Sequence, residues 1–205
     1  MCARDVTVIV ALALALGVVP AKGSSPRGPT IASTYSSTAP AQCRAVGKPD
    51  ALDGGITRVC LGKGGFLLLV SEGDLRETVS VGRNRTAAAR EPAASARFGP
   101  FNSSGNTVEW RTADGKPFAI IQGWQLADNA DADKDGRPRS KAMLVVTRLP
   151  PGPVCHVAYV DVAANREANA LARQAADQTA RDFDCRKDAV KVIGASGRAV
   201  ELTQR

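Results

Sequence analysis

The stretch between Cys155 and Cys185 constrains the fold more than any other part of the chain. Residues 155–161 alternate in the manner of a strand, which predicts Cys155, Val157 and Tyr159 on one face. After this strand, small and apolar residues recur at steps of three and four, which predicts the longest helix of the chain. This stripe consists of Ala164, Ala168, Leu171, Ala172, Ala175, Thr179 and Phe183. We therefore expect a strand and a covering helix, with one cysteine at each end.

Upstream of this stretch, short apolar or alternating segments are separated by turn residues. Residues 66–70 form an apolar run of strand length, and residues 75–81 alternate as a half-buried strand does. The dipeptide at 114–115, Asp-Gly, is typical of a hairpin turn. A series of strands closed by one helix favours an α+β fold. The expected architecture is a mostly antiparallel, meander-like sheet with one long C-terminal helix packed on one face.

The first 21 residues predict a secretory signal peptide. A largely apolar run from Val6 to Val19 follows Arg4, and small residues stand where a signal is cleaved. The run is short for a membrane span, and no later segment approaches its length. We therefore expect residues 1–21 to be removed on export and no transmembrane span to remain.

Composition divides the rest of the chain into three parts. Residues 22–42 are rich in Ser, Thr, Ala, Pro and Gly, which predicts a flexible linker. Residues 43–194 carry the strand and helix patterns and are expected to form a single disulfide-stapled α+β domain. Residues 195–205 have no strong pattern and are expected to be a tail. With the export signal, this organisation predicts a periplasmic or secreted protein.

Cleavage of the signal would remove Cys2 and leave four cysteines. An even number of cysteines in an exported chain predicts disulfides, and four cysteines allow three pairings. We expect the sequential pairing, Cys43–Cys60 and Cys155–Cys185, because each pair encloses a compact unit. A zinc site is not favoured, since no pair has C-x-x-C spacing and the chain has one histidine.

A basic loop at residues 83–105 interrupts the strand pattern. It places four arginines among alanines, prolines and glycines: Arg83, Arg85, Arg90 and Arg97. A loop of this length is functional or mobile, and guanidinium groups suit phosphate and carboxylate ligands. The chain carries a net charge of +7, but nucleic acid is not an expected partner in an exported protein. The leading hypothesis is a non-catalytic periplasmic domain whose arginines bind an anionic envelope component or a partner protein. The alternative is a solvated loop.

A second hypothesis is a calcium-stabilised structural domain. Asp131, Asp133, Asp135 and Gly136 match the first half of a calcium-binding loop. The second half departs from the pattern, because Ala142 stands where a bidentate glutamate is required. A metal-free hairpin loop is the alternative, and calcium is the one cofactor that the sequence suggests.

A third hypothesis is a hydrolase built from scattered carboxylates. The candidate acids are Glu72, Asp74, Glu77 and Glu109. Nothing in the sequence fixes their separation, His156 has no predicted partner, and no G-x-S-x-G motif is present. The segment 62–65 (GKGG) lacks the spacing of a phosphate-binding loop and predicts a plain turn. The sequence therefore favours a protein that is not an enzyme.

Several segments resemble a known group of proteins. They are Glu72-Gly-Asp-Leu-Arg76, Phe98-Gly-Pro-Phe-Asn102, Val108-Glu-Trp-Arg111, Lys116-Pro-Phe-Ala119 and the stretch from Ala168 to Cys185. The sequences of these segments resemble those of small, uncharacterised, exported proteins of Gram-negative bacteria, and the resemblance covers roughly residues 43–194. The resemblance implies a periplasmic location and no particular reaction, and it carries no functional residue over to this chain.

Overall fold

The computed structural model describes residues 28–47 and 55–204, and these residues contain one ten-stranded sheet. The predicted signal peptide lies outside the described residues. The strands are β1 (Ile31–Ser37), β2 (Cys43–Val46), β3 (Thr57–Leu61), β4 (Leu67–Gly73), β5 (Arg76–Gly82), β6 (Asn102–Ala113), β7 (Lys116–Ala132), β8 (Pro138–Arg148), β9 (His156–Asp161) and β10 (Lys191–Val192). The α-helices are α1 (Arg85–Arg90), α2 (Ala168–Thr179) and α3 (Arg198–Glu201), and the 3₁₀ helices are η1 (Pro40–Gln42), η2 (Pro92–Ser95) and η3 (Leu202–Gln204).

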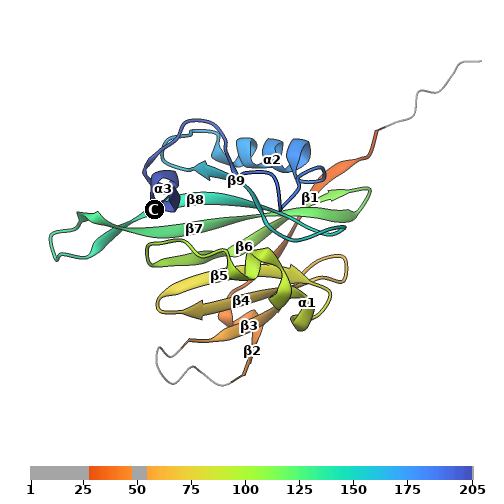
Figure 1. The fold of residues 1–205 in the computed structure, drawn as a ribbon, viewed down its shortest axis with the longest axis horizontal. Coiled ribbons are helices and arrows are strands. Elements are labelled where there is room, and N and C mark those ends of the chain that lie inside the picture. Colours follow the sequence, from red (N-terminus) through yellow and green to blue (C-terminus); the bar gives the residue numbers. More distant parts are fainter. Residues whose placement is uncertain (1–27, 48–54, 205) are drawn as a thin grey trace, which may run out of the picture.

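The sheet consists of two antiparallel meanders, β2–β5 and β6–β9, joined side by side. Its strand order is β10-β9-β8-β7-β6-β5-β4-β3-β2, which Figure 1 shows from β9 at the top to β2 at the bottom. The meanders meet through one parallel pair, Arg76 of β5 and Asn102 of β6. β10 also pairs in parallel, with β9, and β1 runs antiparallel to β6. The sheet is therefore mixed.

The predicted fold class is wrong in its helix as well as in its sheet. No helix among the described residues is long, and α2 has 12 residues. The apolar stripe begins at Ala164, but there the chain forms a turn. The carboxylate of Asp161 accepts from the backbone N–H of Ala164 at 2.9 Å, and the Asn165 amide donates to the Asp161 carbonyl. Such side-chain bonds to the backbone compete with helical bonds, so the helix begins later.

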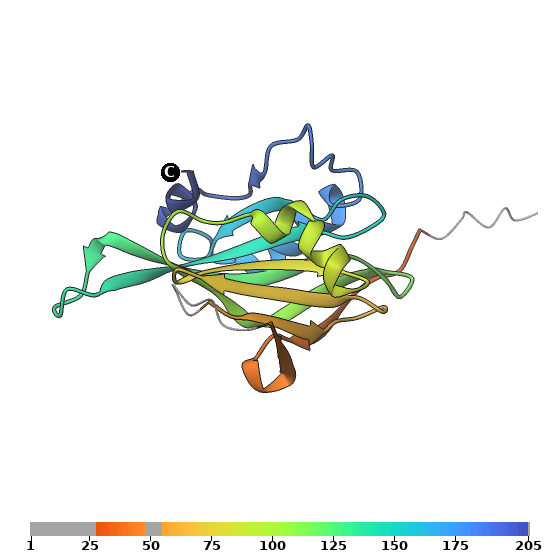
Figure 2. The same cartoon turned by 60° about the horizontal axis from the view of Figure 1, so that its bottom comes forward.

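Two apolar clusters lie on opposite faces of β7 and β8. The first is shared by both meanders and includes Leu68, Val81, Trp110 and Trp124. The second lies between β7–β9 and the alanines of α2, which explains why the buried face of this helix is made of small side chains. The β7–β8 hairpin extends beyond both clusters and projects from the molecule (Figures 1 and 2).

The two segments predicted to lie outside the domain contribute to it. β1, within the expected linker, pairs with β6 along its whole length, and Ser36 accepts a hydrogen bond from Nε1 of Trp110 at 2.8 Å. In the expected tail, Ala199, Val200 and Leu202 are buried in the first cluster. β1 has few large apolar residues, and backbone hydrogen bonds to β6 hold it in the sheet. Hydrophobic periodicity detects the burial of side chains and not the pairing of backbones, so it did not predict this strand.

Both predicted disulfides are confirmed. Cys43 and Cys60 lie opposite each other in the β2–β3 pair, and their bond spans 17 residues of sequence. Cys155 and Cys185 join the start of β9 to the segment that follows α2, across 30 residues. The sequential pairing therefore holds each cross-linked segment against its neighbouring strand.

Within the described ranges, no helix has the length and apolar character needed to cross a membrane.

Candidate anion-binding site

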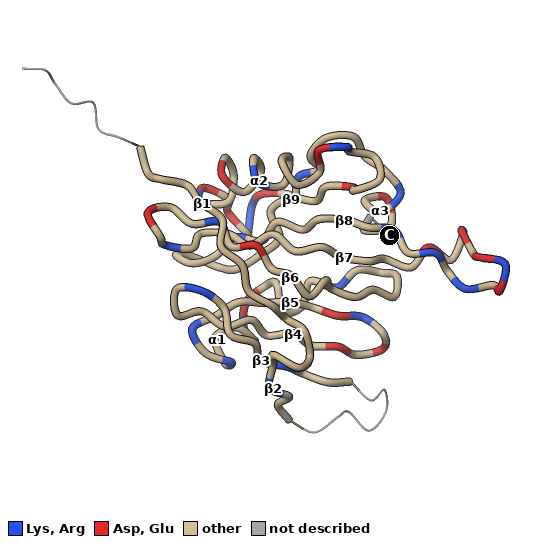
Figure 3. Tube along the Cα trace, turned by 180° about the vertical axis from the view of Figure 1, so that it is seen from behind, with Lys and Arg blue, Asp and Glu red and all other residues tan. Residues whose placement is uncertain are grey.

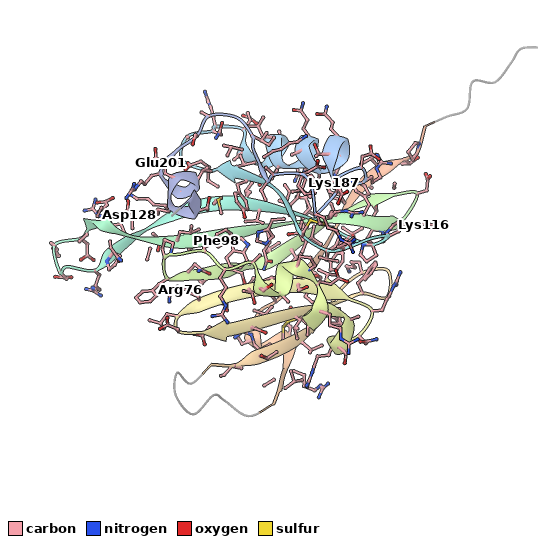
Figure 4. All side chains as sticks on the ribbon, viewed as in Figure 1. Arg76, Phe98, Lys116, Asp128, Lys187 and Glu201 are labelled. Atoms are coloured by element: carbon pink, nitrogen blue, oxygen red, sulfur yellow. A yellow bond between two sulfur atoms is a disulfide. The ribbon has the colours of Figure 1, made fainter. Side chains whose placement is uncertain are left out.

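A pocket of about 490 Å³ lies at the end of the sheet where the β3–β4 turn, the β6–β7 turn and the β8–β9 loop meet. Four basic side chains line it: Arg83, Lys116, Arg148 and Arg181. Among the described residues that line the pocket, none is acidic. Figure 4 labels Lys116 at this end of the molecule, opposite to Asp128. The volume falls within the range of roughly 300–1,000 Å³ that is typical of small-molecule sites.

Arg148 is the buried cation of this pocket. It is the last residue of β8 and is 6% exposed. Its Nε donates to the carbonyl oxygen of Ala180 at 3.1 Å, and its Nη2 donates to that of Pro151 at 2.6 Å. These carbonyls satisfy hydrogen bonds without neutralising the charge, and no described carboxylate forms an ion pair with Arg148. Because a buried charge without a counter-ion is costly, the pocket favours an anion at this point.

Two further arginines are held on phenyl rings at the edge of the pocket. The guanidinium carbon of Arg83 lies 3.8 Å from the ring centroid of Phe66, and that of Arg181 lies 4.9 Å from the ring centroid of Phe118. Arg83 also donates to the carbonyl oxygen of Gly64. Such contacts contribute about 0.5–1 kcal/mol at exposed positions. They hold each charge near the pocket before a ligand arrives, which reduces the entropy lost on binding.

The glycine turn between β3 and β4 forms one wall of the pocket. Gly64 and Gly65 have φ of 59° and 75°, the left-handed region that favours glycine. A Cβ at Gly64 would lie 2.8 Å from Cδ of Pro117, and one at Gly65 would lie 2.9 Å from Nη1 of Arg83. The sequence predicted a plain turn here. Because Gly64 and Gly65 have no side chains, Pro117 and Arg83 can lie close to this part of the β3–β4 turn.

The structure brings one of the four predicted arginines into this pocket. The segment expected to be a long loop contains α1 and η2, because Asn84 caps an alanine-rich helix by accepting from the backbone N–H of Ala87 at 2.9 Å. Arg83 lines the pocket, whereas Arg85, Arg90 and Arg97 are exposed and do not line it. None of these three forms an ion pair within the described residues. The predicted cluster is therefore divided, and the other pocket cations come from distant segments.

The three predicted calcium ligands lie in the projecting β7–β8 hairpin, where Figure 3 shows charges of both signs close together. Asp131 pairs with Lys141, and Asp135 pairs with Arg137 at 2.6 Å. One oxygen of Asp133 accepts from two backbone N–H groups of the turn, at 2.8 and 2.9 Å. No group of three or more potential metal ligands occurs in the described part of the chain. The calcium hypothesis therefore gains no support from the structure.

The carboxylates considered for a hydrolase are held by separate partners. Glu72 and Glu77 are cross-strand neighbours, but Glu77 binds Arg58 at 2.9 Å and Glu72 accepts from a backbone N–H. Burial alone would raise the pKa of Glu109, but hydrogen bonds from Arg173 and Ser33 outweigh it and hold the pKa below its usual range. Asp74 pairs with Arg76. A general acid needs a raised pKa, so Glu109 is unsuited to that role.

His156 is a buried, neutral member of an aromatic cluster. Its Nδ1 lies 3.0 Å from Oη of Tyr159, and its ring stacks on Phe98. Burial lowers the pKa of His156 to about 4 and raises that of Tyr159 to about 12. The sequence placed Tyr159 on the face of Cys155 and Val157, and this was wrong. The β8–β9 pairing skips Val157, and this irregularity moves Tyr159 to the other face.

No family model, no curated protein and no solved structure matches this chain.

Proposed function

We propose that this protein is an exported binding protein, without catalytic activity, whose basic pocket holds a small anionic ligand. The observation that carries this proposal is Arg148, a buried cation with no described carboxylate partner, in a pocket lined by three more cations. An anion beside Arg148 would supply the missing counter-charge in a region of low dielectric, where charged hydrogen bonds are strongest.

The location and the absence of catalysis are part of the same proposal. Two disulfides support an oxidising compartment, and the N-terminal sequence supports export to it. The candidate acids and the histidine are engaged with structural partners, which supports binding rather than catalysis. The proposed site is the pocket and not the basic loop at residues 83–105, and Arg83 belongs to both.

Two triple variants test where the anion binds. The pocket variant combines Arg83→Gln, Lys116→Gln and Arg181→Gln, all at exposed positions that can change without opening the core. Each substitution removes one charge-assisted interaction with the bound phosphate, so the Kd for inorganic phosphate should rise by at least about tenfold. Titrations followed by NMR chemical shifts, at low and physiological ionic strength, measure this value even when binding is weak.

The matched control removes the same charge from the rest of the arginine segment. It combines Arg85→Gln, Arg90→Gln and Arg97→Gln, and its Kd should stay within about twofold of the wild type at physiological salt, where distant charges are screened. The opposite pattern, with the control weakened and the pocket variant unchanged, would place the anion on the arginine segment. Equal binding by all three proteins would show that neither the exposed pocket cations nor the arginine segment contacts the anion, and the proposal in this form would fail.

A further inference from the structure

The cations of the pocket stand among apolar walls. Phe66, Phe118 and Leu149 are buried behind the pocket, whereas Pro117 and Pro150 are half-buried and Pro151 is exposed. A bare inorganic anion would cover the charge of Arg148 and leave the surface of these prolines against water. Since removal of apolar surface from water drives binding, the full pocket suits a ligand with an apolar part.

The distribution of charge indicates how many anionic groups the ligand carries. Arg148 is the one pocket cation that is buried, whereas Arg83, Lys116 and Arg181 are exposed. An exposed cation keeps its hydration and needs no permanent partner, but a buried one does. One anionic head beside Arg148 is therefore sufficient, and the exposed cations attract this head as it enters and add charge-assisted hydrogen bonds once it is bound.

From these observations we infer that the ligand is a compact amphipathic anion. Its phosphate or carboxylate head lies beside Arg148, and its apolar body lies against the wall formed by Pro117, Pro150 and Pro151. This inference rests on the proposed function, because it names the class of molecule that the same pocket takes. The two arginine–phenyl contacts already cover the rings of Phe66 and Phe118, so the prolines are the apolar surface that faces a ligand.

A homologous series of alkyl phosphates tests the inference on the wild-type protein. Methyl, butyl, hexyl and octyl phosphate would be titrated as monomers in a calorimeter, with the alkyl carboxylates and the neutral alkanols of the same lengths beside them. If each added methylene is buried, the Kd should fall about fourfold per methylene until the pocket is full. The carboxylate series reports which of the two heads binds more tightly. The alkanols should bind at least about tenfold more weakly than the phosphates of equal length.

The outcomes separate the ligand class from the proposed function. If the Kd is the same for all phosphates, the pocket binds an anion without an apolar body, and the inference fails while the proposed function stands. If no phosphate or carboxylate binds, both fail. If alkanols bind as tightly as phosphates, the pocket recognises apolar surface alone and the proposed function fails. The pocket variant should weaken every alkyl phosphate by a similar factor and leave the dependence on chain length unchanged. A loss of that dependence in the variant would contradict the inference.

Discussion

Replacing both Cys155 and Cys185 with serine should lower the free energy of unfolding by about 4 kcal/mol, the largest effect that we expect from removing a single feature. The bond closes a loop with a sequence separation of 30 residues, and in the chain-entropy model a loop of this size gives roughly that value. The bond also fixes the segment that carries the buried Phe183 and the pocket residue Arg181. Thermal unfolding should show a decrease of about 10 °C in Tm.

The matched control replaces Cys43 and Cys60, whose separation is 17 residues. The same model gives about 3 kcal/mol for this bond, and the two cysteines lie on strands that the β2–β3 ladder already pairs. We therefore expect a smaller decrease in Tm, and no change in phosphate affinity at temperatures where the variant is folded. Equal decreases in Tm for the two variants, or a larger one for the control, would contradict this ranking.

Lowering the pH should destabilise the protein through its one histidine. Burial depresses the pKa of His156 from 6.5 to about 4, so between these values the unfolded chain binds a proton that the folded chain does not. Stability is therefore complete above the unfolded pKa and is lost as the pH falls toward the folded pKa. From about pH 7.5 to about pH 5, this group alone should lower the free energy of unfolding by about 2 kcal/mol.

The size of the decrease in the pKa of His156 depends on the groups around its ring. Tyr159 contacts the ring, stays neutral over this range of pH, and adds no charge to stabilise an imidazolium. Asp188 lines the same small hollow but is exposed to water. Urea unfolding across the pH range, for the wild type and for His156→Gln, measures the difference in slope. The variant should lose the histidine-dependent part of the pH dependence. If the two profiles have the same shape, the histidine titrates with an ordinary pKa.

Sequence patterns predicted the parts of this fold that depend on local chemistry. The cysteine pairs followed from their count and spacing, and the alanine stripe identified the buried face of α2. The patterns failed where pairing is made by the backbone. β1 carries few apolar residues, and the junction of the two meanders is a single parallel pair, Arg76 with Asn102. Neither the β1–β6 pair nor this parallel pair produces a hydrophobic periodicity in the sequence. An antiparallel meander was therefore expected where the sheet is mixed.

The candidate site could be predicted only in part, for a similar reason. Guanidinium chemistry singled out Arg83, but the other pocket cations come from the start of β7, the end of β8 and the segment after α2. They are brought together by the strand order and not by their spacing in the sequence. The buried state of Arg148 is equally a product of the fold, because in the sequence it is one basic residue among many. The turn glycines were a second local signal, but their sequence predicted only a plain turn, and their positive φ and close neighbours are visible only in the fold.

The location of the bound anion is the central claim, and a crystal structure of the protein with hexyl phosphate tests it most directly. We expect the phosphate within hydrogen-bond distance, about 3 Å, of the Arg148 guanidinium, and the alkyl chain against Pro117, Pro150 and Pro151. Phosphate density beside Arg85, Arg90 or Arg97, or on the β7–β8 hairpin, with an empty pocket, would contradict the account.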